Sequence, residues 1–298
     1  MKAYFHVPDG IDFRRYFVPE TFTPLFYTPL YAELTAKQRL RYNQLHGCYC
    51  NEQIIFFEMF VGENVLPALQ RSKAAESLLP QLRAFLEEER RHTRMFYDLN
   101  RRCLPRLYEH EHFHFIKIPL GVKLLIGWVA PQSWFIPVFV WLMLLQEERA
   151  VYIGREIVRR RDNLEPNFVA LQRAHLADEI RHVQWDQEIL ATTSGKTSSI
   201  QRQCHAWLLR RIIGEFLLTP KRASLRVIEE LVKEFPELEP RSAAMRSGLL
   251  GLARDPAWNL SLYSRVIAPK TFALFDQRSE FSSLSSTLLG YRPGEANG

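Results

Sequence analysis

The stretch His175-Leu-Ala-Asp178-Glu179-Ile-Arg-His182 decides how this chain is expected to fold. Residues three, four and seven apart share one face of an α-helix, so His175, Glu179 and His182 would point the same way. A second Glu-x-x-His pair, Glu89-Arg-Arg-His92, occurs earlier in the chain. Two such pairs, with a lone Glu from each of two further helices, form the dinuclear carboxylate site of a four-helix bundle. The sequence therefore predicts this bundle, with two more carboxylates to be identified.

The first of these carboxylates is predicted to be Glu58. At 100° per residue its helical neighbours on the same face are uncharged, whereas Glu52 and Glu63 point together to another side. A charged group on an apolar face is costly unless it is paired or bound to a metal. Gly62, one turn later, would leave open space beside a metal ion. A salt bridge from Glu58 to a buried arginine is the alternative interpretation.

The second carboxylate comes from one of two adjacent acids, Glu147 and Glu148, which point 100° apart and cannot both face the centre. Glu147 shares its face with apolar residues such as Met143 and Val151, whereas the face of Glu148 continues into Arg155. We predict Glu147 as the metal ligand. The reverse assignment is the alternative.

Two further acids are placed to support the histidines. Asp178 stands about 100° to the side of the stripe that carries His175 and His182, where its carboxylate would hold the outer N–H of a ligating imidazole. Asp186, one turn after His182, is a second candidate for that task.

The predicted ligand set holds four carboxylates and three imidazoles: Glu58, Glu89, His92, Glu147, His175, Glu179 and His182. Four negative charges balance two divalent ions, and mixed oxygen and imidazole ligation suits iron or manganese better than zinc. We expect an apolar substrate pocket beside the ions, lined by Phe57, Val61, Phe85, Phe96 and Val151. No flavin, nicotinamide or iron–sulfur motif is visible, so electrons would come from an external donor.

Helical periodicity extends over most of the chain and predicts an all-α fold with a four-helix bundle core and extra flanking helices. The expected helices cover about 36–66, 78–102, 134–161, 165–193, 198–217, 221–235 and 240–253. We expect an irregular N-terminal arm over residues 1–35, a helical domain over 36–255, and a partly loose C-terminal extension over 256–298. The Ser- and Gly-rich end, from Ser279 to Gly298, is expected to be the loose part.

Residues 121–145 are largely apolar but are interrupted by Lys123 and two prolines, and their longest unbroken apolar run is far short of the ~20 residues of a membrane span. We expect a hydrophobic connection leading into a buried helix, with peripheral membrane contact as the minority interpretation.

The N-terminus lacks the apolar stretch of a signal peptide. Four cysteines without zinc or disulfide spacing favour a reducing cytoplasm. The net charge of +6 is attributed to solvated helix faces, with attraction of an acidic substrate or partner as the minority interpretation, and no nucleic-acid partner is expected.

The motif of residues 175–182 resembles the His-Leu-x-Asp-Glu-x-x-His motif of the p-aminobenzoate N-oxygenase (AurF-type) family. Asn51-Glu52, followed six residues later by Glu58, matches the first-helix motif of that family, and Glu89-x-x-His92 matches its second. The single Glu of its third helix falls on Glu147 or Glu148. The similarity covers roughly residues 40–190, and Cys50 replaces an aromatic residue of the family's pattern.

This resemblance implies a ferritin-like bundle with two irons, in which O2 as co-substrate oxidises a small aryl or alkyl amine to a hydroxylamine, nitroso or nitro product. It further implies a homodimer that acts in natural-product biosynthesis, on an amine that arrives free or on a carrier protein.

Three alternatives share parts of the pattern. A radical-generating ribonucleotide reductase subunit would carry a tyrosine where this chain has Phe96. A di-iron C–H hydroxylase or desaturase shares most of the ligands, and only the additional His175 argues against it. The third alternative is a protein without enzymatic activity, either an iron-storage protein or a helical module that binds no metal. Metal analysis of the purified protein would distinguish both from a di-iron enzyme.

The motif His110-x-His112-x-His114 is expected to be an exposed loop or short strand, and Cys48-x-Cys50 to consist of packing residues.

Overall fold

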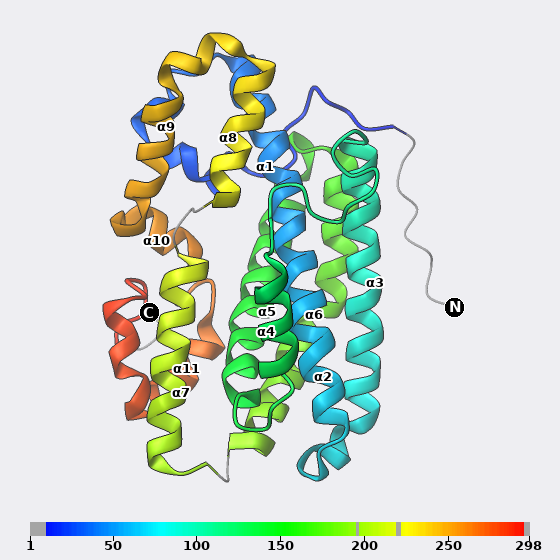
Figure 1. Ribbon diagram of the computed structural model, residues 1–298, viewed down its shortest axis with the longest axis vertical. Coiled ribbons are helices and arrows are strands. Elements are labelled where there is room, and N and C mark those ends of the chain that lie inside the picture. Colours follow the sequence, from blue (N-terminus) through cyan, green and yellow to red (C-terminus); the bar gives the residue numbers. More distant parts are fainter. Residues whose placement is uncertain (1–9, 195–196, 219–221, 295–298) are drawn as a thin grey trace.

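The structure is a computed structural model that describes residues 10–194, 197–218 and 222–294. Within these ranges the chain is built from helices and loops and contains no β-strand, as the periodicity predicted. Four long helical segments lie side by side in a bundle, and shorter helices cover one side and one end of it (Figure 1). The predicted all-α, ferritin-like fold class is confirmed.

The first segment of the bundle consists of α1 (Ala36–Phe57), a π-helical turn (Glu58–Gly62) and α2 (Glu63–Gln70). The others are α3 (Leu79–Cys103), α5 (Ile136–Arg159) and α6 (Pro166–Ser194). α1 begins with a capping box, in which the Thr35 side chain accepts from the Gln38 N–H and the Gln38 side chain accepts from the Thr35 N–H. α5 and α6 approach closely at Gly154, where a Cβ would lie 3.2 Å from Leu176 Cβ.

The π-helical turn differs from the sequence prediction, which expected one uninterrupted helix over residues 36–66. A π-helical turn adds a residue to the ordinary α-helical repeat and re-aims the side chains that follow it. Glu58 lies at its first position and is buried. The interruption therefore coincides with the carboxylate predicted to be a metal ligand.

The N-terminal residues 10–35 wrap along the bundle as a series of short 3-10 turns. Asn43 of α1 fixes this arm, because its Oδ1 accepts hydrogen bonds from the N–H groups of Phe17 and Val18. Phe17 is fully buried and stacks on Phe168 of α6. The first nine residues of the predicted arm lie outside the described residues.

The remaining helices are α7 (Ser199–Ile212) with a π-helical turn (Ile213–Leu217), α8 (Arg222–Glu234), α9 (Glu239–Gly251), α10 (Pro256–Leu262) and α11 (Pro269–Asp276). α8 packs on α1 and on α9 at one end of the bundle, whereas α7 and α11 pack on α5 (Figure 1). The stretch Ser279–Ser286, predicted to be loose, forms a 3-10 helix instead. Its apolar residues Phe281 and Leu284 are buried, and these anchors outweigh the serine-rich composition.

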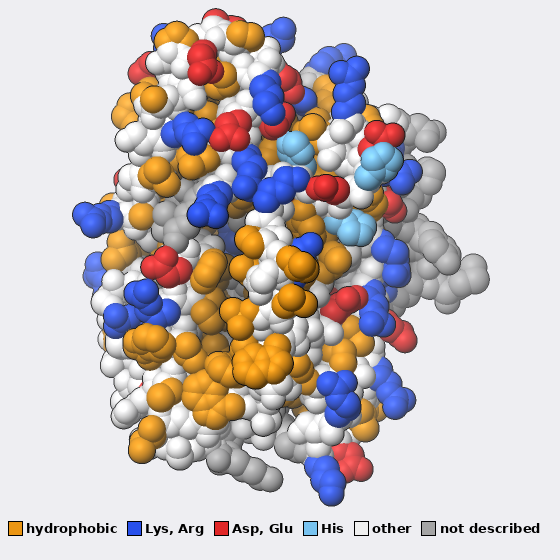
Figure 2. Space-filling model, viewed as in Figure 1, with side chains coloured by type: hydrophobic (Ala, Val, Ile, Leu, Met, Phe, Trp, Pro, Cys, Tyr) orange, Lys and Arg blue, Asp and Glu red, His pale blue; other side chains and the backbone are white. Residues whose placement is uncertain are grey.

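Residues 120–129, predicted as a connection, form the helix α4 (Leu120–Val129), which buries none of its residues. Hydrophobic side chains gather on the surface over this helix (Figure 2), including Leu120, 71% exposed, and Trp128, 67% exposed. The following helix α5 begins with buried apolar residues, as expected. Within the described residues, every helix is too short or too polar to cross a membrane.

Candidate metal centre

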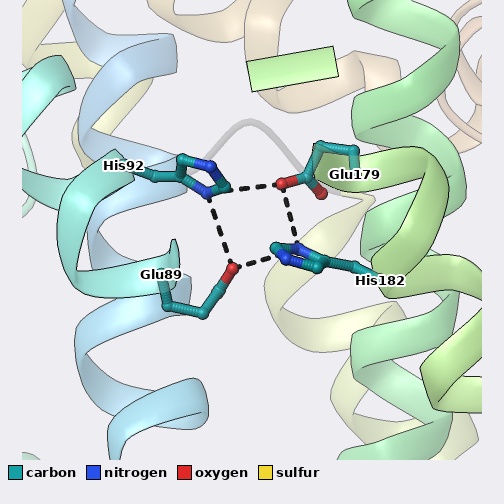
Figure 3. Close-up of side chains that lie close together, drawn as sticks. All are labelled: Glu89, His92, Glu179 and His182. Atoms are coloured by element: carbon teal, nitrogen blue, oxygen red, sulfur yellow. Dashed lines mark ion pairs between the residues drawn. The ribbon is translucent and has the colours of Figure 1, made fainter. Parts of the chain in front are cut away.

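Each of the four bundle segments contributes buried side chains to one cluster. Glu58 comes from the π-helical turn after α1, and Glu147 comes from α5. Glu89 and His92 of α3 point toward Glu179 and His182 of α6, as Figure 3 shows. His175 lies two turns before His182 on α6. All seven predicted ligands are buried, and the structure brings them to one place in the bundle.

The inner nitrogen of His92 lies at the centre of the cluster. Its Nδ1 is 3.7 Å from Glu58 Oε1, 3.6 Å from Glu89 Oε1 and 3.5 Å from Glu179 Oε1. His92 therefore belongs to two groups of donor atoms close enough to hold an ion, one with Glu89, Glu179 and His182, the other with Glu58 and His175. The two groups are adjacent, which is the arrangement that a dinuclear site requires.

The other two histidines complete the two groups. His182 Nδ1 is 3.3 Å from both Glu89 Oε1 and Glu179 Oε1 and 4.0 Å from Glu147 Oε2. His175 Nε2 is 2.9 Å from Glu179 Oε1 and 3.6 Å from Glu58 Oε1. Glu179 thus approaches all three imidazoles.

An acid of each helix, α3 and α6, holds the outer nitrogen of a histidine on the other helix. His92 Nε2 lies 3.2 Å from Asp178 Oδ2, and His182 Nε2 lies 3.1 Å from Glu88 Oε2. When these outer nitrogens donate to the carboxylates, each ring keeps a lone pair on Nδ1, which faces the cluster. Asp178 was predicted for this task. Glu88 was not, because it points about 100° away from Glu89 on its helix and so lies outside the face that carries Glu89 and His92.

Two arginines fix the supporting acids. Arg91 pairs with Asp178, and Arg181 pairs with both Asp178 and Glu88, with 2.8 Å between Arg181 Nη2 and Glu88 Oε1. The sequence carries a signal of this arrangement. Residues 88–92 and residues 178–182 both follow the pattern acid-Glu-x-Arg-His. The two helices α3 and α6 therefore carry the same motif.

Burial and mutual repulsion perturb the ionisation of the cluster. Burial, followed by the charges of Glu89 and Glu179, raises the pKa of Glu58 well above its ordinary value. Burial alone would lower the pKa of His182, but the nearby carboxylates, Glu179 foremost, outweigh it and raise this pKa to about 10. Burial and the neighbouring imidazoles of His92 and His182 push the pKa of His175 far down. Without a cation, these groups therefore have to share protons.

The polar atoms of this cluster fit a bound metal. Within the described part of the chain, Glu89 Oε1, His92 Nδ1, both oxygens of Glu179 and His182 Nδ1 are buried and have no hydrogen-bond partner. Buried polar atoms are nearly always satisfied, so an unsatisfied set that converges on one place calls for an explanation. Carboxylate oxygens and imidazole nitrogens are the donors that iron and manganese accept.

The two adjacent acids of α5 have different surroundings. Glu147 approaches His182, as described above. Glu148 instead accepts hydrogen bonds from the N–H groups of Lys270 and Thr271, at 2.8 and 2.7 Å, at the start of α11. A carboxylate at a helix N-terminus satisfies free N–H groups there. Glu148 therefore holds α11 to the bundle, and Glu147 is the acid that faces the cluster.

Aromatic rings pack against the imidazoles of the cluster. Phe85 stacks on His182 with 4.1 Å between ring centroids, and Phe96 meets His175 edge-on at 4.9 Å. A Cβ on Gly62 would meet only the Glu89 side chain within 4 Å, at 3.4 Å from Oε2. These residues line the cluster; the substrate pocket predicted from them stays a prediction.

The motif Asn51-Glu52 has a structural task. Glu52 is fully buried and accepts hydrogen bonds from the Tyr108 hydroxyl and from the N–H groups of His114, Phe115 and Ile116. It ties the loop after α3 to α1. That loop contains the predicted histidine motif without forming a strand, and its His114 contacts Glu230 at 3.1 Å.

Comparison with known proteins identifies one similarity. The family model for p-aminobenzoate N-oxygenase AurF matches residues 7–247, a range that contains every residue of the cluster. No curated protein and no solved structure matches the chain.

Proposed function

The chain belongs to the p-aminobenzoate N-oxygenase AurF family, and on that premise we propose that it is a non-haem di-iron monooxygenase. Its reaction would use O2 to oxidise a small aryl or alkyl amine to a hydroxylamine, nitroso or nitro product. The observation that carries this proposal is the convergence of buried, unpartnered carboxylate and imidazole atoms from four helical segments.

We propose that the iron ligands are the seven residues of the cluster: Glu58, Glu89, His92, Glu147, His175, Glu179 and His182. Three imidazoles and four carboxylates would neutralise two ferrous ions, since four negative charges meet four positive ones. Bound iron would supply the redox chemistry that activates O2.

The chain's own residues would prepare this site in three ways. Asp178 and Glu88 orient the imidazoles of His92 and His182 by accepting from their outer N–H groups. Phe85 and Phe96 keep water away from the imidazoles, because both rings are fully buried against them. Thr93 Oγ1 donates to Glu58 Oε2 at 2.9 Å and limits the positions that this carboxylate adopts.

The remaining parts of the proposal concern partners. An external reductant would deliver the electrons that the reaction requires. We further propose a homodimer that works in the cytoplasm in natural-product biosynthesis, and an amine that arrives free or bound to a carrier protein. The four cysteines support a reducing compartment, because none of them forms a disulfide.

The experiment that tests the function supplies iron-loaded protein with a chemical reductant, 18O2 and a panel of aryl and alkyl amines. We expect a product that carries labelled oxygen on nitrogen, with one labelled atom in a hydroxylamine or nitroso product and two in a nitro product. The matched control is Glu179→Ala, which removes the carboxylate nearest to all three imidazoles. Labelled oxygen on carbon, or loss of two hydrogens from carbon, would support the C–H hydroxylase or desaturase instead.

A further inference from the structure

Asp186 is a buried acid that the proposed ligand set and its supporting contacts do not use. Its side chain is fully buried, and both carboxylate oxygens lack a hydrogen-bond partner among the described residues. An unpaired carboxylate inside a protein is strongly unfavourable. Because burying this carboxyl group without a partner destabilises the fold, we expect Asp186 to have a functional role.

Other buried acids outside the cluster have evident structural tasks. Glu52 accepts four hydrogen bonds from the loop after α3, and Glu148 accepts two at the start of α11. Glu165 accepts from the N–H of Phe168, in the first turn of α6. Asp186 has no comparable donor, so a structural task does not explain it.

The position of Asp186 relates it to the metal cluster. It follows His182 by four residues and Glu179 by seven, which places it on the same face of α6 as both. Burial raises the pKa of its carboxyl group well above the ordinary value, and the charges of His182, Glu89 and Glu179 also act on this pKa. It is nevertheless not part of either group of donor atoms close enough to share an ion. Asp186 thus borders the cluster without belonging to it.

We propose that the Asp186 carboxyl group accepts a hydrogen bond from an N–H of the substrate amine and so holds the nitrogen beside the cluster. This inference rests on the proposed function. An uncharged primary or secondary amine carries the N–H donor that Asp186 lacks, and an uncharged tertiary amine does not. The site would therefore discriminate between amines by their N–H groups, as sites with buried polar groups do.

The test measures amine binding in iron-loaded protein without O2, so that no turnover interferes. The probe is whichever of the two arylamines 4-aminobenzoate and aniline binds the wild type more tightly, compared with its N,N-dimethyl analogue. The measurement is made at about pH 7.5, where the nitrogen of these arylamines is uncharged. Asp186→Leu removes the acceptor. Glu188→Gln, at an exposed position two residues away, is the matched control.

We expect Asp186→Leu to weaken binding of the N–H amine by about 10- to 100-fold, the range of one hydrogen bond to a charged or buried group. Binding of the dimethyl analogue, the iron content and binding by the control variant should stay at the wild-type level. The melting temperature of Asp186→Leu should rise, because an unsatisfied buried group is removed. A purely structural role would lower the melting temperature and affect both amines equally.

Three results would overturn the inference. If wild type oxidises amines but Asp186→Leu binds the N–H probe as tightly as wild type, Asp186 is not the anchor and the proposed function stands. If Asp186→Leu loses iron, the residue belongs to the metal site. If wild-type protein oxidises no amine of a broad panel, the proposed function fails and the inference fails with it.

Discussion

Replacing Glu88 by Gln tests the reciprocal support of the histidines. Glu88 uses one oxygen for His182 Nε2, at 3.1 Å, and the other for Arg181 Nη2, at 2.8 Å. Both partners are donors, so both oxygens act as acceptors. In the Glu88→Gln variant one oxygen becomes an NH2 group, which places a donor against a donor. The variant can therefore keep only one of the two contacts, and its neutral amide oxygen is a weaker acceptor for the His182 N–H than the carboxylate oxygen it replaces.

The expected loss follows from the role of such contacts at metal sites. Removing the partner of a ligating histidine typically weakens metal binding by about 10- to 100-fold, which corresponds to about 1.4 to 2.7 kcal/mol. We expect a loss in this range for Glu88→Gln, measured as anaerobic Fe(II) affinity in competition with a chromophoric chelator. Glu87→Gln, one residue earlier and exposed, removes the same charge without the contact and should bind iron like wild type. Equal iron affinity of the two variants would refute the reasoning.

Three further predictions concern activity and stability. His175→Ala should keep the helical circular-dichroism spectrum yet impair amine oxidation, and full activity would assign His175 to the core. His46, buried with its pKa lowered to about 3, stays neutral in the folded state, whereas the unfolded chain binds a proton below its ordinary pKa of 6.5. Stability should therefore fall as the pH drops below 6.5, by about 2 kcal/mol at pH 5. Urea unfolding of wild type and His46→Gln at pH 7.5 and pH 5 checks this, and an equal loss in both proteins would contradict it. Gly290→Ala should destabilise the protein by at least about 2 kcal/mol in the same assay, because its Cβ would lie 2.2 Å from the Tyr263 carbonyl oxygen. An unchanged unfolding midpoint would show that this packing is looser than described.

The sequence allowed the helices and the faces of the cluster to be predicted, because both depend on local periodicity. Glu58 lies on an otherwise uncharged helical face, and Glu89, His92 and Glu179 belong to the two Glu-x-x-His pairs. The structure places all four in one buried cluster. That these residues bind metal remains the proposal tested by the experiments above.

Contacts between distant segments were harder to predict. Glu88 was missed because its task depends on which residue of α6 lies opposite it, and a single helix does not reveal this register. Likewise, the apolar neighbours on its helical face favoured Glu147 over Glu148 as the ligand. Only the tertiary structure shows that the Glu148 carboxylate accepts hydrogen bonds from N–H groups at the start of α11. The π-helical turn at Glu58 leaves no mark in composition or periodicity.

The α4 helix shows a further limit of prediction from pattern. The interruption of residues 121–145 by Lys123 and two prolines indicated that this segment does not span a membrane, and none of the described helices is long and apolar enough to do so. The pattern did not reveal that residues 120–129 form an exposed helix. Hydrophobicity predicts that a segment can be buried, whereas its actual burial depends on the elements around it.

The buried cluster is proposed to bind two iron ions, and the number of irons that each chain retains can be measured. The protein is loaded with Fe(II) without O2, separated from free iron and analysed for metal content, in parallel with Glu179→Ala. We predict about two irons per wild-type chain, as dinuclear bundle sites hold, and fewer than about one in the variant. Wild-type protein that retains no iron, takes up many ions, or matches its Glu179→Ala variant would show that the cluster is not a di-iron site.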